Sequence, residues 1–162
     1  MTEEEHALTH IDAQGRLRMV DVTEKEVTWR EAVAEGRVRL SGETLRRIGD
    51  KSIPKGNVYE AARLAGILAA KKTWELIPLC HPLQLTGIEV DFYVEAEKSE
   101  IKIVSRVKTR DRTGVEMEAL VAVTHAALTI YDMCKAIDRD MSIHGVQLVF
   151  KSGGRSGTYQ RA

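Results

Sequence analysis

Cysteine, proline and phenylalanine are scarce in this sequence, and neither sign of charge is in excess. The two cysteines, Cys80 and Cys134, are too few for a disulfide framework, so we expect a reduced, cytoplasmic protein. The 24 basic residues balance the 24 acidic ones, which argues against a general nucleic-acid or membrane-surface binder. A chain of 162 residues buries roughly 70% of its unfolded surface, so it needs no disulfide or metal to fold.

The chain shows no signal-peptide pattern and no linker between domains. Its first ten residues, MTEEEHALTH, are acidic and lack an apolar core. We expect a single domain over residues 1–162, with mobile ends at 1–10 and 153–162. The apolar run 117–137 has the composition of a membrane span, but four polar side chains interrupt it, so a buried helix is the better prediction. They are Glu118, His125, Asp132 and Lys135.

The first clear local signal is a capping-box spacing in TWREAVAEG. Thr28 and Glu31 have this spacing, and Gly36 follows as a stop signal, so we expect a short helix over residues 28–36. A short alternating strand over residues 37–41 follows.

A second capping-box spacing precedes a longer helix. After a helical piece over residues 42–49, Asn57 and Glu60 predict a helix that runs to about Trp74. Three of its residues are small, which suits close packing on a sheet: Ala65, Gly66 and Ala69.

The second half of the chain opens with a strand hairpin. Residues 88–95 alternate apolar and polar side chains, the period of a strand with one buried face. The segment EKSE turns the chain and a second strand returns. Thr113 and Glu116 form a third capping-box spacing, from which we expect a long helix to about Asp138. Residues 142–152 are the last strand.

The resulting order is strand, helix, strand, strand, helix, strand. This is the split βαβ order of ferredoxin-like α+β folds, an antiparallel sheet with helices on one face, here with extra short N-terminal helices. The fold hosts many functions, so function has to be argued from the site.

The long helix places polar groups on one face. At 100° per residue, four of them fall within about 60° of one another: Glu118, His125, Thr129 and Asp132. Lys135 follows Asp132 at i,i+3, so the two side chains can form an ion pair. One explanation is a purely structural pair. The other is catalysis, with the carboxylate as general base and the lysine as general acid.

Three segments have features of anion-binding sites. Lys55 precedes a predicted helix N-terminus, where free N–H groups and the helix dipole attract anions. The basic loop KTRDR leads into the long helix, where a capping role explains Glu116. Lys151 and Arg155 flank a glycine pair whose amides could form a nest for a phosphate. Solvated side chains and a frayed tail are the alternatives, but together the segments favour a small polyanionic ligand.

The segment WELIPLCHPLQLTG places Cys80 and His81 between Pro78 and Pro82. A zinc site requires about four ligands, and Cys80 has neither a CxxC partner nor suitably spaced histidines. A cysteine nucleophile requires a base that faces the thiol, which adjacent residues rarely achieve. We therefore expect a stiff turn that presents backbone groups and His81 to a ligand, without a metal. An ordinary loop histidine is the alternative.

Four segments, in order along the chain, carry a resemblance to a known family: KKTWELIPLCHPL, TGVEMEAL, ALTIYDMCKA and KSGG. They resemble the signature segments of the cyclic pyranopterin monophosphate synthase (molybdenum cofactor biosynthesis protein C) family, over about residues 8–157. The resemblance implies a cytoplasmic lyase acting on 3′,8-cyclo-7,8-dihydroguanosine 5′-triphosphate, the product of a preceding radical enzyme. The reaction forms the pyranopterin ring and a cyclic phosphate and releases pyrophosphate. The resemblance also implies a homohexamer, a trimer of dimers, with active sites at subunit interfaces.

The resemblance implies site residues as well. Catalytic roles match Lys55, His81, Asp132 and Lys135. Substrate contacts match a larger set: Leu79, Cys80, His81, Met117, Glu118, Lys151 and Arg30. Where the family has Lys-Gly-Asp this chain has Asn57 in third place, which still caps a helix. No metal or cofactor is implied, although Mg²⁺ can accompany the triphosphate. No motif matches His125 and His144.

Two other functions remain as alternatives. A ferredoxin-like RNA-binding module displays stacking aromatic side chains on its central strands, but this chain has only two phenylalanines, and Phe92 is on the predicted apolar face. A catalytically silent oligomeric scaffold would use Asp132 and Lys135 for structure alone. Substitution of Asp132 separates these classes, because a scaffold would lose stability whereas an enzyme would lose turnover with its assembly intact.

Overall fold

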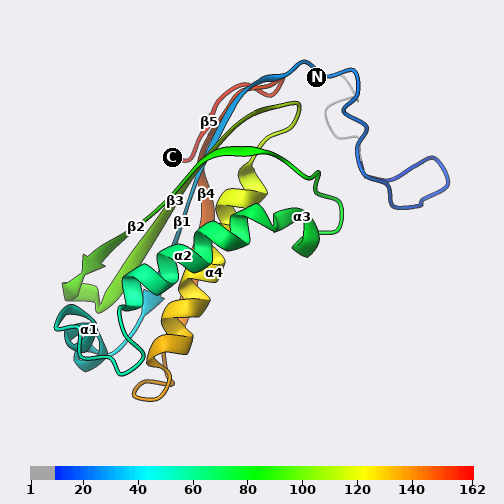
Figure 1. Ribbon diagram of the computed structural model, residues 1–162. Coiled ribbons are helices and arrows are strands. Elements are labelled where there is room, and N and C mark those ends of the chain that lie inside the picture. The colour runs from blue at the N-terminus through cyan, green and yellow to red at the C-terminus, as the bar shows by residue number, and fades with distance from the viewer. Residues whose placement is uncertain (1–9) are drawn as a thin grey trace.

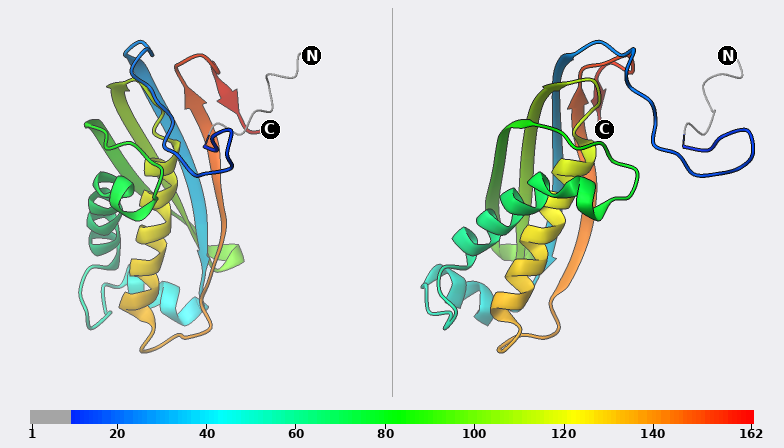
Figure 2. Two further views of the ribbon diagram at one scale, coloured as in Figure 1. Left: turned by 90° about the vertical axis from the view of Figure 1, so that its right-hand side faces the viewer. Right: turned by 45° about the vertical axis from the view of Figure 1, so that its right-hand side comes forward.

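The computed structural model describes residues 10–162 as a β-sheet with two long helices packed on one of its faces (Figures 1 and 2). The elements, in chain order, are β1 (Thr28–Arg39), α1 (Gly42–Gly49), α2 (Val58–Lys71), α3 (Thr73–Leu76), β2 (Leu85–Glu95), η2 (Ala96–Lys98), β3 (Glu100–Asp111), α4 (Glu116–Cys134), β4 (Ser142–Ser152) and β5 (Tyr159–Gln160). The prediction of a mobile end over residues 1–10 falls almost entirely outside the described residues.

The sheet has the strand order β2-β3-β1-β4-β5, and all neighbouring strands are antiparallel. Helix α2 connects β1 to β2 and α4 connects β3 to β4, and both cover the same face of the sheet (Figure 2). This arrangement confirms the ferredoxin-like α+β fold, including the hairpin and the last long strand. The short strand β5, within residues 153–162, was not predicted.

Residues 28–36 form the first part of β1, so the helix predicted there is wrong. Ala32, Ala34 and Val38 are fully buried, whereas the residues between them point to the opposite face, as in a strand. Pairing with β3 along one edge and β4 along the other outweighs the local capping signal. Gly36 does not stop a helix. A Cβ there would lie 2.6 Å from Cγ1 of Val123, so the glycine allows α4 to approach the sheet.

The N-terminal cap of α2 is confirmed. The side chain of Asn57 accepts a hydrogen bond from the amide of Glu60 at 3.2 Å. The helix ends at Lys71 rather than continuing to Trp74, because Lys72 leaves helical geometry with φ of −111° and the separate turn α3 follows. The helical piece predicted over residues 42–49 is also confirmed, as α1.

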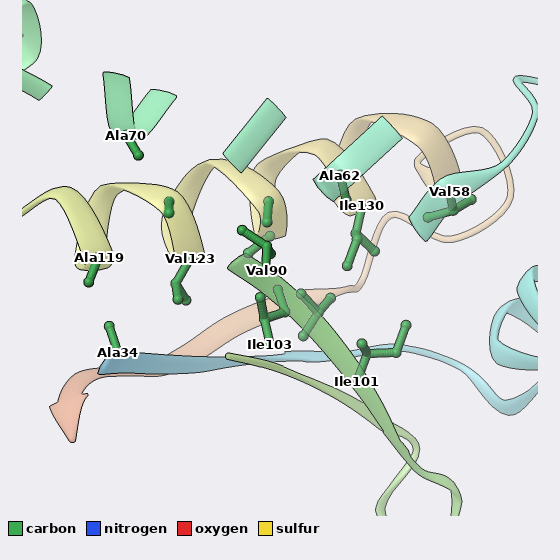
Figure 3. Packing of buried hydrophobic residues seen from close by; sticks show 14 of the residues in the cluster. Ala34, Val58, Ala62, Ala70, Val90, Ile101, Ile103, Ala119, Val123 and Ile130 are labelled. Carbon is green, nitrogen blue, oxygen red and sulfur yellow. The ribbon is translucent and has the colours of Figure 1, made fainter. Parts of the chain in front are cut away.

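Small residues let α2 and α4 pack closely on each other and on the sheet. A Cβ on Gly66 would lie 2.9 Å from the carbonyl oxygen of Ala122 on α4 and 3.3 Å from Cγ2 of Val90 on β2. Figure 3 shows the layer beneath the helices, where Ile103 and Ile101 on β3 lie below α4, with Ile101 under Ile130. The small residues predicted to suit sheet packing therefore serve helix–helix packing as well.

Helix α4 is the buried helix that was predicted for the apolar run. Nine of its residues are buried, and none of the helices within residues 10–162 is long and apolar enough to cross a membrane. The capping box predicted from Thr113 and Glu116 is wrong. Val115 is the N-cap residue, and its carbonyl oxygen accepts a hydrogen bond from the amide of Ala119. No side chain caps the helix. The side chain of Glu116 is thereby left available for other contacts.

Candidate active site

Helix α4 carries predicted site residues at both of its ends. Fourteen positions separate Glu118 from Asp132, so at 1.5 Å per residue the two lie about 21 Å apart along the helix axis. Fourteen positions are close to four full turns, so both residues are on the same face. The candidate residues therefore form two separate groups within one chain.

At the C-terminal end of α4, Asp132 contacts two lysines. Its Oδ1 lies 2.7 Å from Nζ of Lys135, and its Oδ2 lies 3.0 Å from Nζ of Lys55. Lys55, from the loop between α1 and α2, also donates to the backbone carbonyl of Asp132 at 2.8 Å. The predicted Asp132–Lys135 pair is confirmed, but all three side chains are about half exposed rather than buried.

The two lysines keep this carboxylate charged. Hydrogen bonds from Lys135 first, and then from Lys55, lower the pKa of Asp132 to about 2 from its ordinary value of 3.8. The same contact raises the pKa of Lys135. Half-exposed ion pairs contribute little to folding stability, so a cluster of this kind remains available to a ligand or to another subunit.

A cavity of about 330 Å³ lies beside the N-terminal end of α4. The turn between α3 and β2 contributes Leu79, Cys80 and His81 to its wall, and α4 contributes Met117 and Glu118. Five of the predicted substrate-contacting residues, from two distant segments, therefore line one cavity.

The segment before β1 forms another wall of this cavity. Val20 and Val22 line it together with His10, and the carbonyl oxygen of Val20 lies 2.7 Å from Nε2 of His81. No local sequence signal marks this segment, because its contact with His81 spans about sixty positions.

Glu118 is buried in this wall without a full set of partners. The residue is 4% exposed, and its Oε2 is buried with no hydrogen-bond partner among the described residues. Burial raises the pKa of its carboxyl group to about 7 from 4.5, and the charge of Glu116 adds to this effect. Buried polar atoms are normally paired, so an unpaired one that lines a cavity marks a position where a ligand can bind.

Cys80 has the properties of a packed thiol rather than an activated one. Burial raises its pKa above the ordinary value of 9.0, and the charge of Glu118 raises it further. A reactive cysteine requires the opposite shift. Among residues 10–162, no group of three or more histidine, cysteine, aspartate or glutamate side chains is arranged to hold a metal ion.

A second cavity, of about 670 Å³, adjoins the first. Five cationic residues line it: Lys25, Arg30, Arg112, Lys151 and Arg155. Three carboxylates also line it: Glu24, Glu26 and Glu116. Because cations are in excess, this cavity favours an anionic ligand.

The two cavities are parts of one cleft around the N-terminal end of α4, which we call the α4 cleft. They share four lining residues: Lys25, Thr113, Gly114 and Glu116. One part of the α4 cleft is cationic, and the other contains Glu118 and His81. Such a cleft can hold an anionic chain and a polar ring system of one ligand side by side.

Glu116 belongs to the α4 cleft, so its predicted role as a simple helix cap is wrong. It lines both parts of the cleft, and its Oε1 lies 4.0 Å from Nζ of Lys151. A Cβ on Gly114 would lie 2.0 Å from its Oε2, so this glycine leaves room for the carboxylate.

Sequence reasoning missed Arg112 and Lys25 as individual residues. Nε of Arg112 donates to the carbonyl of Lys25 at 3.1 Å, and its own carbonyl accepts from Nη2 of Arg30 at 3.1 Å. The sequence predicts only that the basic loop before α4 attracts anions. Which of its residues faces the cleft depends on how it packs against β1.

Other residues singled out from the sequence lie away from the α4 cleft. Nδ1 of His125 is 3.0 Å from the carbonyl of Val121, and Nε2 of His144 is 3.0 Å from Oε1 of Glu100. Phe92 packs with its ring centroid 5.2 Å from that of Tyr59. The ring of Phe92 is therefore engaged within the protein.

This chain has clear relatives among known proteins. The sequence model of the MoaC family matches residues 19–154. A protein of Pelotomaculum thermopropionicum named cyclic pyranopterin monophosphate synthase is 60% identical over 154 residues, which cover 95% of this chain and 91% of the relative. A protein of the same name from Thermoanaerobacter sp. is 58% identical, with 95% and 98% covered. A third, from Desulfatibacillum aliphaticivorans, is 56% identical, with 93% and 95% covered. Because the family model and these relatives span nearly the whole chain, the protein belongs to the MoaC family.

Proposed function

We propose that this protein is a cyclic pyranopterin monophosphate synthase, a lyase in molybdenum cofactor biosynthesis. It converts 3′,8-cyclo-7,8-dihydroguanosine 5′-triphosphate to cyclic pyranopterin monophosphate and releases pyrophosphate. The observation that carries the proposal is the α4 cleft, in which a cationic part adjoins a part lined by Glu118 and His81. The relatives that bear this name, at 56–60% identity over nearly the whole chain, support it.

The cationic part of the cleft suits the triphosphate. Arginine side chains bind phosphate oxygens through a planar fork and lysines through point charges, and Arg30 and Lys151 supply one of each. A ribose hydroxyl gives up its proton to a base and attacks the α-phosphorus, the bond from that phosphorus to the oxygen that bridges to the β-phosphate breaks, and pyrophosphate leaves. Cations around the phosphate chain stabilise the charge that develops on the leaving group.

The other part of the cleft suits the purine-derived ring. Ring opening and re-closure require a proton to be removed at one atom and delivered at another. Burial raises the pKa of the Glu118 carboxyl group to about 7, so this group can give up and take up a proton near neutral pH, and His81 lines the same cavity. Asp132, Lys55 and Lys135 form the remaining catalytic group, with Asp132 charged between two ammonium groups.

The catalytic cluster around Asp132 lies about 21 Å along α4 from Glu118, too far to act on the same ligand atoms. We therefore propose that the protein assembles as a homohexamer, a trimer of dimers, and that each site combines the α4 cleft of one chain with the Asp132 cluster of another. Exposed leucines on the helical layer support burial of this face by another subunit: Leu64, Leu68 and Leu128.

The proposal includes no resident metal or cofactor, and Mg²⁺ that accompanies the triphosphate enters with the substrate. It also places the protein in the cytoplasm, after a radical enzyme that forms the cyclic nucleotide substrate. The experiment is turnover of the purified protein with that substrate, followed by release of pyrophosphate and by detection of the pyranopterin. GTP is the matched control and should not react. Absence of product from a folded, assembled protein would refute the proposal.

A further inference from the structure

The guanidinium group of Arg30 lies in a narrow space in the cationic part of the α4 cleft, between the carbonyl group of Arg112 and Gly154. We call this space the Arg30 seat. Arg30 has the same strand parity as Ala32 and Ala34, so it extends from β1 toward the helical face of the sheet. Its Nη2 donates to the carbonyl of Arg112 at 3.1 Å. Its Nε is buried and has no hydrogen-bond partner among the described residues. The guanidinium is thus fixed in place with unused capacity to donate hydrogen bonds.

Gly154 forms the other side of this seat. A Cβ built on Gly154 would lie 2.0 Å from Nη1 and 2.7 Å from Cζ of Arg30. Any other residue at this position would therefore place its side chain where the guanidinium now lies. Gly154 belongs to the turn after β4, so the contact links the end of β4 to the start of the neighbouring strand β1.

The two adjacent glycines of this turn have different tasks. A Cβ on Gly153 would lie 2.1 Å from the backbone carbonyl oxygen of Trp29, which cannot move without moving β1. A Cβ on Gly154 meets only the far end of a flexible side chain. Alanine at 153 would therefore disturb the backbone, whereas alanine at 154 would chiefly displace the Arg30 guanidinium.

We infer that Gly154 is a positioning residue for the phosphate-binding part of the α4 cleft, because it seats the guanidinium of Arg30. This inference rests on the proposed function in that it takes the anion to be a phosphate chain. A pre-oriented guanidinium can bind two phosphate oxygens at once without first losing side-chain freedom. The glycine pair therefore acts through the arginine that it accommodates, not only through its own amide groups.

Gly157 provides a matched control in the same turn. Its φ of +64° resembles the +75° of Gly154, so alanine incurs a similar backbone strain at both positions. No atom lies within 4 Å of a Cβ built on Gly157. Gly154→Ala and Gly157→Ala therefore differ mainly in whether Arg30 is displaced.

The probe is inorganic tripolyphosphate, whose binding to the purified protein is measured by calorimetry. Gly154→Ala should weaken the affinity about tenfold or more, as expected for the loss of a charged hydrogen bond, and should raise KM for the substrate more than it lowers kcat. Gly157→Ala should change both values less than about twofold. Equal effects of the two variants would overturn the inference, as would failure of the unsubstituted protein to bind tripolyphosphate.

A double-mutant cycle tests whether Gly154 acts through Arg30. In an Arg30→Ala background, the addition of Gly154→Ala should cause no further loss of affinity for tripolyphosphate. The Arg30→Ala/Gly154→Ala protein should also have a melting temperature no lower than that of the Arg30→Ala/Gly157→Ala protein. Equal losses in both backgrounds, or failure to fold in both, would assign Gly154 a role independent of Arg30 and overturn the inference. Because binding of tripolyphosphate requires no turnover, a protein that passes this test but makes no pyranopterin would refute the proposed function alone.

Discussion

Nε2 of His81 lies 2.7 Å from the carbonyl oxygen of Val20. A carbonyl oxygen only accepts hydrogen bonds, so Nε2 carries the hydrogen and the neutral ring has its free lone pair on Nδ1. A backbone contact of this kind fixes both the tautomer and the orientation of an imidazole. The segment before β1 thereby fixes the orientation of His81 and leaves the lone pair of its neutral ring on Nδ1.

The first prediction follows from that tautomer. His81→Gln retains an N–H group that can reach Val20 but has no titratable nitrogen, so it should fold normally and lose roughly 10²–10⁴-fold in kcat. His81→Ala should lose at least as much. The measurements are steady-state turnover and thermal unfolding of each variant. Near-normal kcat for His81→Gln would reduce the role of His81 to positioning.

Cys80 should be replaceable even though it lines the same cavity. Its pKa is raised by burial, so the thiol is protonated at neutral pH and is a poor nucleophile. Cys80→Ser and Cys80→Ala should both retain a sizeable fraction of the turnover, measured with the assembly state checked by light scattering. A correctly assembled but inactive Cys80→Ser protein would return the thiol to the mechanism.

Lys135 should be needed as a proton carrier and not only as a charge. Lys135→Arg retains a cation beside Asp132 but gives up a proton even less readily than a lysine, so we expect kcat to fall by roughly 10²-fold or more. Binding of tripolyphosphate, measured in parallel, should change little. If Lys135→Arg keeps near-normal turnover, only the charge at this position matters.

Mixing of inactive variants tests whether sites are shared between chains. His81→Ala removes a residue of the α4 cleft, and Asp132→Asn removes the centre of the lysine cluster. Co-assembly of the two in equal amounts should restore about one quarter of the wild-type turnover. Half of the chains have an intact α4 cleft and the other half have an intact Asp132 cluster, so random pairing completes about one site in four.

The matched control for this mixing experiment pairs His81→Ala with Arg30→Ala. Both residues line the α4 cleft, so no combination of these two chains contains an intact cleft, and the mixture should stay inactive. If the first mixture also stays inactive although the chains co-assemble, each site is built within one chain.

Glu118 should make folding stability depend on pH. Its pKa is raised to about 7 from 4.5, so the folded protein binds this proton more tightly than the unfolded chain does. The contribution of this group to stability is therefore greatest below about pH 4.5 and declines as the pH rises through about 7, by up to about 3 kcal/mol.

Glu118→Gln removes that titration. The variant should be about 3 kcal/mol more stable than the wild type at pH 8 and within about 1 kcal/mol of it at pH 5. Between these values, the stability of the variant should depend less on pH than that of the wild type. Denaturant unfolding of both proteins at one protein concentration measures the difference. A wild type that gains stability from pH 5 to pH 8 relative to Glu118→Gln would show that the carboxylate has a partner in the assembly that the isolated chain does not supply.

Local sequence signals were sufficient where a feature depends on neighbours in the chain. Asn57 caps α2, and Asp132 pairs with Lys135 one turn later, because both contacts span only three positions. The alternation over residues 88–95 predicted β2, because one face of that strand is buried whatever its partners are. The order of these elements was enough for the ferredoxin-like fold.

Tertiary structure decided the features that depend on distant partners. Residues 28–36 have a helix-like local pattern, yet β3 and β4 pair with them on both edges and make them a strand. Glu116 has the spacing of a cap, but it lies beside Gly114 and Lys151 in the cleft. The seat of Arg30 against Gly154 joins residues 124 positions apart. Such contacts follow from which strands lie side by side, and that arrangement is selected by burial of the whole apolar core rather than by any single segment.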